Sequence, residues 1–284
     1  NVAIGSNSLG VLTTGQNNTA VGYNAGDAIT TGNNNSIFGL NAGTDMTDSI
    51  DCALFGTGAG ENITTGNYNT AIGRNALAAN TTADQCTAVG RLALYGNTTG
   101  ANNTAVGSSA MQVSTTGANN VAVGYQAGDA ITTACCNTIV GSSAGTATTT
   151  GAGNTALGNG ALSANTTGPN NVALGYLSLD ANTTGSSNVA VGVNALGANT
   201  TASNNTAVGN SAGVAITTGT NNTYLGASAG AAITTGAQSV AIGTYALTAA
   251  TDPVNSTCVG HDAGKAITTG DSNTYIGQGT GIAT

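Results

Sequence analysis

The chain has little of what a conventional globular domain needs. Only 5% of its 284 residues are charged, it has two Phe and no Trp, and two Pro stand against 44 Gly. An ordinary domain carries about 25% charged residues and fills its core with bulky apolar side chains. A single large globular core is therefore excluded.

The charge balance and the hydropathy pattern exclude two classes of partner. With three Lys and Arg against eleven Asp and Glu, the formal net charge is −8. Binding to nucleic acid or to an anionic membrane surface needs basic patches, and no apolar run approaches the ~18–20 residues of a membrane span. We expect no nucleic-acid partner and no membrane insertion in this segment. The chain opens on Asn1 without a signal-peptide pattern, so we interpret residues 1–284 as one uninterrupted repeat array, a window of a longer fibre without separate domains or caps.

What the chain has is a strict repeat. A glycine recurs every 17 residues from Gly5 to Gly277, in seventeen copies without insertion or deletion. We number the slots of each copy from that glycine, so slot −1 precedes it and slot +1 follows it. Slot +3 is nearly always Ala, slot +8 is always Thr, slot +9 is Thr or Asp, slot −4 is mostly Asn, and slot +1 accepts almost anything. A slot as permissive as +1 is predicted to face water.

Slot −1 is always large and apolar, so we predict that it points inward and forms the structural core ladder. Its members are Ile4, Val21, Phe38, Phe55, Ile72, Val89, Val106, Val123, Val140, Leu157, Leu174, Val191, Val208, Leu225, Ile242, Val259 and Ile276.

Slots +4 and +7 exchange size with each other. In seven copies slot +4 is Gly and slot +7 is apolar, as in Gly26 with Ile29; in seven more slot +4 is Leu or Met and slot +7 is polar or small, as in Leu94 with Asn97. The three exceptions are Leu9 with Leu12, Gly145 with Thr148 and Gly281 with Thr284. One interior volume filled from either of two positions explains this exchange, because overfilling or emptying such a volume costs ~1–3 kcal/mol or more. A disordered tract would feel no such constraint.

A 17-residue period punctuated by Gly, Thr and Asn is typical of a β-solenoid, since helical repeats need ~33–47 residues. We predict an all-β fold, a parallel β-roll or β-solenoid of seventeen coils, each with one strand over slots −4 to +1 and a second over slots +4 to +8. Asn and Thr rows should hydrogen-bond along the stack. The core is thin, which favours a side-by-side parallel homotrimer, although a dimer or a helical fibril also fits the composition.

Two stretches carry a family resemblance. Asn18–Gly26 (NTAVGYNAG) and Asn188–Leu196 (NVAVGVNAL) resemble the YadA-like head repeats of trimeric autotransporter adhesins. They are also similar to the 17-residue arrays of bacterial surface fibres and phage tail-fibre proteins. The resemblance covers the whole chain. It implies a left-handed β-roll, three chains side by side, and an extracellular adhesive or receptor-binding fibre on a cell surface or a virion.

Residues that could carry catalysis or bind a metal are scarce. The one histidine, His261, stands at the permissive slot +1, so we interpret it as solvent-facing and expect no enzyme and no cofactor. Asp45, Asp48, Asp51 and Glu61 could gather oxygen ligands for Ca²⁺, but no EF-hand or Gly-Gly-x-Gly-x-Asp motif is present. We therefore predict no metal site and keep a calcium-dependent module as an alternative.

The five cysteines do not form a ladder. Cys52 and Cys86 occupy slot −4 two coils apart, roughly 9–10 Å in a stacked array, which is too far for a disulfide. We interpret the cysteines as small buried or turn residues, with inter-chain pairing at Cys135 or Cys136 as the alternative.

Twelve Asn-x-Ser/Thr sequons suggest possible glycan attachment. Abundant Asn and Thr also produce sequons by chance, so a glycan-coated filament is kept as an alternative to a bare fibre. A flat Thr array would suit ice binding, but alternate residues of a strand face opposite sides, which leaves one Thr row where two are expected. The sequons are Asn17, Asn34, Asn62, Asn80, Asn97, Asn102, Asn165, Asn182, Asn199, Asn204, Asn221 and Asn255.

The function that the sequence supports best is structural. We predict a stiff, repetitive segment of an extracellular adhesive fibre that associates with copies of itself and contacts a cell-surface or glycan receptor. A secreted filament that polymerises end to end is the alternative.

Overall fold

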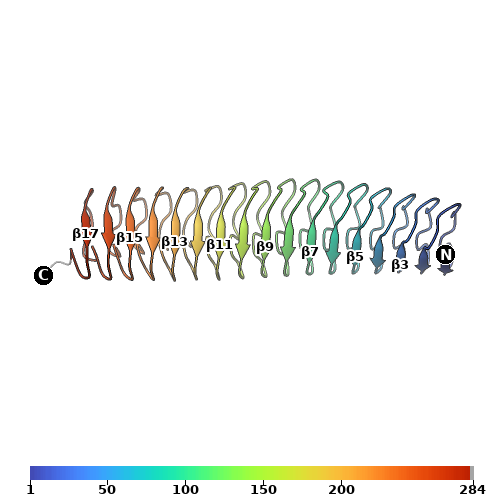
Figure 1. Ribbon diagram of the computed structural model, residues 1–284, viewed down its shortest axis with the longest axis horizontal. Coiled ribbons are helices and arrows are strands. Elements are labelled where there is room, and N and C mark those ends of the chain that lie inside the picture. The colour runs from blue at the N-terminus through green and yellow to red at the C-terminus, as the bar shows by residue number, and fades with distance from the viewer. Residues whose placement is uncertain (282–284) are drawn as a thin grey trace. The chain divides into compact units, whose positions relative to one another are not determined.

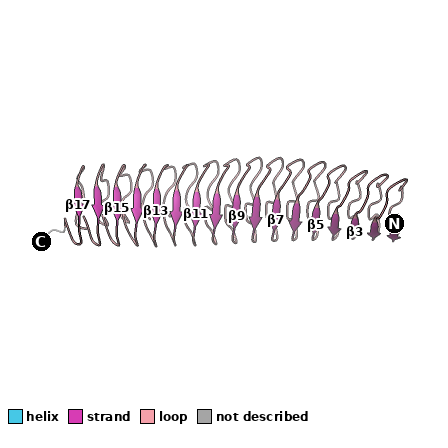
Figure 2. Ribbon diagram, in the orientation of Figure 1, coloured by secondary structure: helices cyan, strands magenta, loops and turns pink. Residues whose placement is uncertain are grey.

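The computed structural model describes residues 1–281 and shows an all-β chain, with no helix among those residues. It divides into two compact units, 1–142 and 143–284. Each unit is a β-solenoid with one three-residue strand per coil (Figures 1 and 2). Unit 1 contains β1 (Val2–Ile4), β2 (Thr19–Val21), β3 (Ser36–Phe38), β4 (Ala53–Phe55), β5 (Thr70–Ile72), β6 (Thr87–Val89), β7 (Thr104–Val106), β8 (Val121–Val123) and β9 (Thr138–Val140). Unit 2 contains β10 (Thr155–Leu157), β11 (Val172–Leu174), β12 (Val189–Val191), β13 (Thr206–Val208), β14 (Thr223–Leu225), β15 (Val240–Ile242), β16 (Thr257–Val259) and β17 (Thr274–Ile276).

Within each unit the coils stack in register. Every strand pairs in parallel with the next one along the chain, and partners are 17 residues apart, as in Ala105 with Ala122 and Ala190 with Ala207. Equivalent slots therefore lie side by side, and the predicted parallel β-solenoid with a 17-residue coil is confirmed.

The predicted direction of slot −1 is wrong. In strands β2 to β16 the middle residue, slot −2, is fully buried, while slots −3 and −1 are at least partly exposed, so Ala122 is 0% exposed and Val123 is not part of the core. In the end strands β1 and β17 the middle residue is not fully buried. Successive side chains of a strand point to opposite faces, so an error of one residue reverses the whole assignment. The ladder from Ile4 to Ile276 therefore lies on the outward face of the sheet, and the slot −2 row lines the interior.

The predicted second strand over slots +4 to +8 is also absent. Slots +2 and +4 adopt left-handed backbone conformations, as in Asn75 (φ 54°) and Leu77 (φ 55°), and such residues cannot lie in a β-strand. The segment still hydrogen-bonds to the next coil, where Leu77 N–H donates to Ala93 O at 2.9 Å. Each coil is thus one short strand closed by a long series of turns.

The predicted exchange between slots +4 and +7 is confirmed as a packing rule. Ile29 at slot +7 and Leu77 and Leu94 at slot +4 are all fully buried in coil interiors. A Cβ on Gly26 would come within 2.9 Å of the Ile29 Cδ1. Such a coil therefore has room for a large side chain from one of these slots but not from both. The first coil carries Leu9 and Leu12 together, and Leu12 is only partly buried there.

Slot −2 belongs to the same interior volume. A Cβ on Gly43 would lie 2.9 Å from Leu54 Cδ1, and Cβ atoms on Gly213 and Gly230 would lie 2.6 and 2.7 Å from the ring of Tyr224. Large residues at slot −2 accordingly stand between coils that have Gly at slot +4. Elsewhere the slot holds Ala, apart from Cys258.

The glycine at slot 0 is required by the close approach of stacked coils. Gly124 has φ 139°, and a Cβ there would lie 2.5 Å from the carbonyl oxygen of Gly141. A side chain at this slot would be strained by its backbone conformation and would also collide with the next coil. These two demands explain why all seventeen copies keep the glycine.

Rows of hydrogen bonds run along the stack at two slots, as predicted. At slot −4, Asn18 Oδ1 accepts the backbone N–H of Asn35 at 3.0 Å, and Asn18 Nδ2 donates to Gly32 O at 2.8 Å. At slot +8, Thr64 Oγ1 donates to Thr81 O at 3.0 Å. The buried Asn row satisfies backbone groups that the short strands leave unpaired.

Candidate functional site

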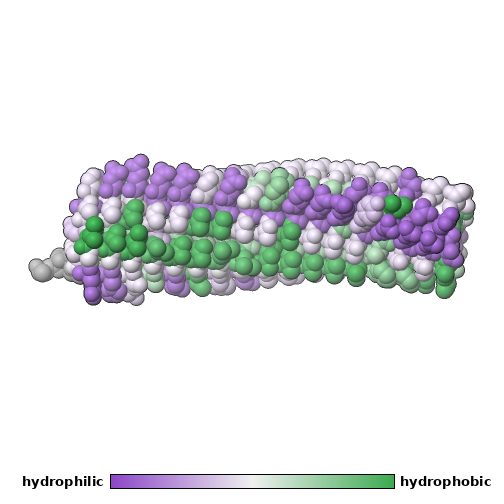
Figure 3. Space-filling model, in the orientation of Figure 1, coloured by the Kyte–Doolittle hydropathy of each residue, from purple (hydrophilic) through white to green (hydrophobic). Residues whose placement is uncertain are grey.

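The outward face of the strands is the candidate functional surface, because it recurs in every coil that the structure describes. It consists of slots −3, −1 and +1, and we call it the strand face. Slot −1 is apolar in every coil, yet Phe55, Leu157 and Leu225 expose 38%, 50% and 45% of their surface. In both units hydrophobic residues gather in a band at the level of the strands (Figure 3).

Aromatic side chains add to this apolar character. The rings of Phe38 and Phe55, both at slot −1, stack with centroids 4.9 Å apart and planes 7° from parallel. Tyr23, Tyr125 and Tyr176 at slot +1 are more than half exposed, which agrees with the prediction that this slot faces water. Tyr is enriched in protein interfaces because it offers large area at little entropic cost.

The structure divides the twelve sequons into two groups. Those at slot +7 are fully buried: Asn80, Asn97, Asn165, Asn182 and Asn199. Their amides serve the turn that follows, as in Asn80, whose Oδ1 accepts Ala83 N–H and whose Nδ2 donates to Ala83 O. A glycan cannot occupy these positions in the folded chain, so these five predicted sites are wrong.

The remaining seven sequons are accessible. All seven asparagines are exposed: Asn17, Asn34, Asn62, Asn102, Asn204, Asn221 and Asn255. All but Asn62 lie at slot +12, where the backbone is left-handed, as in Asn102 with φ 60°. Asn tolerates that conformation better than other non-glycine residues, so the slot has a structural reason to hold Asn whether or not it is modified.

Threonine at slot +9 is exposed in every coil of the stack. A water-facing slot is expected to accept any residue, as slot +1 does, but slot +9 holds only Thr or Asp. The threonine hydroxyl is not needed inside the solenoid: within residues 1–281 the Thr65 hydroxyl forms no hydrogen bond, whereas the Thr64 hydroxyl at slot +8 donates to Thr81 O in the next coil. Among the described slot +9 residues, only Thr235 bonds within the row, donating to Asp252 Oδ1 at 2.8 Å.

The polar residues considered as chemical candidates do not assemble into a catalytic or metal centre. No cluster of three or more His, Cys, Asp or Glu suited to a metal occurs in residues 1–281, so Asp45, Asp48, Asp51 and Glu61 form no calcium cage there. His261 is exposed and contacts Asp262, Nδ1 to Oδ2, at 3.2 Å.

A small charged cluster surrounds that histidine. Lys265 Nζ pairs with Asp262 Oδ1 at 2.9 Å and lies 5.2 Å from the centre of the Tyr245 ring, against which His261 packs edge-on. These contacts lie on the surface, and the four residues that make them include no Ser, Thr or Cys. They tie two neighbouring coils together.

Three carboxyl and phenol groups have perturbed pKa values because of burial. Desolvation raises the pKa of Asp129 and of Asp180, which are each partly buried at slot +5. Desolvation also raises the pKa of Tyr224, whose hydroxyl is buried without a hydrogen-bond partner. None of these groups faces another reactive side chain, so the shifts reflect packing.

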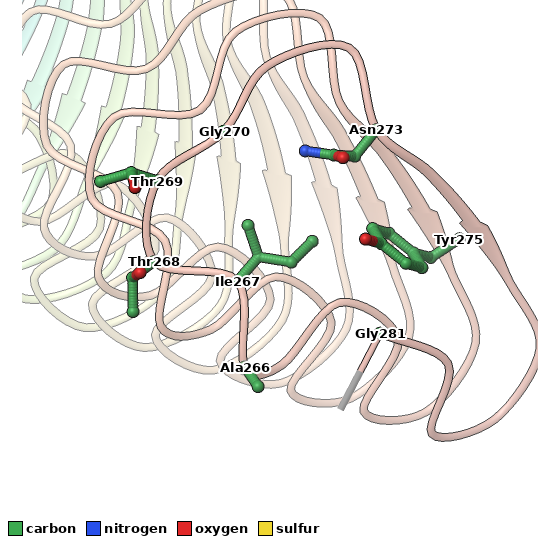
Figure 4. A pocket seen from close by; sticks show the side chains of 8 residues that line it. All are labelled: Ala266, Ile267, Thr268, Thr269, Gly270, Asn273, Tyr275 and Gly281. Carbon is green, nitrogen blue, oxygen red and sulfur yellow. The ribbon is translucent and has the colours of Figure 1, made fainter. Parts of the chain in front are cut away.

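One cavity of about 410 Å³ lies in unit 2. Figure 4 shows Ile267, Asn273 and Tyr275 pointing into it from the last described coil. Its lining joins Ile267 and Tyr275, which stand at interior slots, to the exposed Thr268 and Thr269, and includes no charged residue and no cysteine.

No family model matches this chain, and no curated protein is significantly similar to it. Within residues 1–281, no helix has the length and hydropathy needed to cross a membrane.

Proposed function

We propose that the chain is a structural segment of an extracellular fibre, in which copies associate side by side through the strand face. The observation that carries the proposal is the slot −1 row. An outward slot that needed only to meet water would accept polar residues, as slot +1 does, yet slot −1 is Val, Ile, Leu or Phe in every coil. A contiguous exposed apolar surface of this kind marks an interaction site.

The size of the strand face suits a stable contact. In unit 1 alone, the three slots of the strand face in each of nine coils provide 27 residues. A stable interface takes about 20–30 residues and about 800 Å² from each partner. A second copy of the chain, which offers the same repeat, matches this surface coil for coil, and the similarity to YadA-like heads favours three parallel chains. The mechanism is mechanical, because stacked hydrogen-bonded coils hold the segment stiff while exposed slots meet solvent or a receptor.

The test compares charges on two exposed rows. Val106→Asp with Val123→Asp places two carboxylates on the strand face, and Thr116→Asp with Thr133→Asp places two at slot +9. Asp already occupies slot +9 naturally, at Asp48 and Asp252. Light scattering after size exclusion should give three times the chain mass for the unchanged protein and for the Thr variant. The Val variant should give a lower mass with an unchanged β circular dichroism spectrum. A monomeric unchanged protein, or equal association by both variants, would refute the proposal.

A second candidate function is a glycan-bearing filament, which the seven exposed sequons favour. Peptide mapping of material from its native source distinguishes the two. Sugar on Asn102 and none on Asn97 would support a coat on the turns, whereas unmodified Asn102 and its six exposed equivalents would leave a bare fibre.

A further inference from the structure

Cys135 and Cys136 form a pair of adjacent thiols on the surface of unit 1. They occupy slots +11 and +12 in the turn that precedes β9, where Cys135 is half-buried and Cys136 is exposed. Cys136 has a left-handed backbone with φ 65°, and its N–H donates to Ala118 O at 3.2 Å. The backbone of the previous coil therefore holds this turn in place.

The other three thiols are unavailable. Cys52 and Cys86 replace Asn in the buried slot −4 row, where their sulfurs donate to Gly66 O and Gly100 O. Cys258 is buried at slot −2. Burial raises the pKa of Cys52 to about 11 and also raises the pKa values of Cys86 and Cys258. Because the thiolate is the reactive form, these three cysteines are inert in the folded chain.

The two surface cysteines are close to one another because they are consecutive in one turn. The trans peptide bond between them holds their Cα atoms about 3.8 Å apart. Two thiols attached at that spacing can both bond to one ligand atom. Within residues 1–281, no His, Asp or Glu joins them in a group of three suited to a metal, so the pair offers two sulfur ligands.

We propose that Cys135 and Cys136 form a two-sulfur site for soft, thiophilic centres, of which a trivalent arsenical is the simplest. Soft centres prefer sulfur ligands to the oxygen ligands that dominate this chain's surface. With an organoarsenic oxide, two As–S bonds form, the As=O bond breaks, and the oxygen leaves as water with the two thiol protons. The arsenic stays trivalent, so the reaction needs neither an oxidant nor a reductant.

Phenylarsine oxide tests the site on the full, reduced chain. Intact mass spectrometry should show one phenylarsenic adduct per chain, reversed by a small dithiol and not by an equal concentration of a monothiol. Cys135→Ser and Cys136→Ser should each weaken binding at least about 100-fold, because joining two attachment points raises affinity by about 10²–10⁴. Cys86→Ser is the matched control and should bind like the unchanged chain.

Three results would overturn the proposal. They are the absence of an adduct on the reduced folded chain, an adduct that persists in either single variant, and an adduct that requires denaturant. The last would assign the reaction to buried cysteines. Since serine is close in size to cysteine and both residues lie on a turn, the variants should fold, and circular dichroism checks this directly.

Discussion

The exchange of volume between slots +4 and +7 allows one coil type to be converted into the other. Leu94 and Asn97 are both fully buried in one coil of unit 1, while Gly128 and Ile131 fill the same slots two coils later. We therefore predict that Leu94→Gly and Asn97→Ile are each destabilising and that together they largely restore stability.

The magnitudes follow from the two environments. Leu94→Gly empties the interior at a cost of about 2–5 kcal/mol, offset by about 1–2 kcal/mol because Leu94 has the left-handed φ of 49° that suits glycine. Asn97→Ile overfills the interior at a cost of about 1–3 kcal/mol. It also removes the 3.0 Å bond from Asn97 Nδ2 to Gly100 O, although Asn103 Nδ2 still donates to that oxygen. The double variant keeps one large apolar side chain in the interior, in the combination that Gly128 and Ile131 already form, and should lose less than about 1.5 kcal/mol.

The assay is urea unfolding of the unchanged chain, both single variants and the double variant, followed by circular dichroism. We expect a favourable coupling energy of at least about 1.5 kcal/mol, within the range seen for residues in contact. Thr99→Ala, at the exposed slot +9 of the same coil, is the control and should shift the midpoint little. If the costs of the two single changes simply add, the two slots do not share one volume.

Three further predictions concern single residues. Gly124→Ala should cost more than the about 1–3 kcal/mol of its disfavoured φ alone, because its Cβ would lie 2.5 Å from Gly141 O in the next coil. Gly197→Ala is the control, because no atom would come closer than 3.4 Å to its Cβ and slot +5 holds Ala elsewhere, as in Ala78; it should cost less, and equal melting temperatures would contradict the stacking argument. Tyr224→Phe should raise stability by up to about 1–3 kcal/mol, because it removes a buried hydroxyl without a partner; a lower melting temperature would reveal a bond to that hydroxyl. Burial raises the pKa of Asp129 above its value in the unfolded chain. At a pH between these two pKa values the folded chain therefore binds more protons than the unfolded chain. The contribution of Asp129 to stability is greatest below the unfolded pKa and falls as the pH rises from the unfolded to the folded pKa. Asp129→Asn should therefore raise the melting temperature more at pH 7 than at pH 3, and an equal effect at both would refute the assignment.

The 17-residue period, the parallel register and the exchange between slots +4 and +7 could be predicted from the sequence. Each of them appears as a slot that stays constant or as two slots that vary together, and recognising such a pattern does not require knowing which way a side chain points. The face of the strand could not be inferred from size alone. Val123 is larger than Ala122, and hydrophobicity favours burying the larger residue, but the interior is so narrow that Ala fits beside Leu or Ile from the turn.

A signal for the correct face was nevertheless present in the sequence. Ile37, Leu54 and Tyr224 at slot −2 each follow a coil with Gly at slot +4, a dependence that only an inward slot would show. The sequons misled for a related reason. Asn97 and Asn102 both begin an Asn-x-Thr motif, but the Asn97 amide hydrogen-bonds to a buried turn, whereas the Asn102 side chain is exposed to water. The three-residue motif alone does not distinguish a buried asparagine from an exposed one.

The shared interior volume also constrains how such an array can change during evolution. Gain or loss of whole 17-residue modules keeps the register, so array length is free to vary. Module order is not free, because a module carrying Tyr224 needs Gly213 in the module before it and Gly230 within its own. A recombination that joined it to a module of the Leu94 type would force two large side chains into one space. Natural arrays should therefore contain only permitted neighbours, and shuffled libraries selected for folding should recover the same junctions.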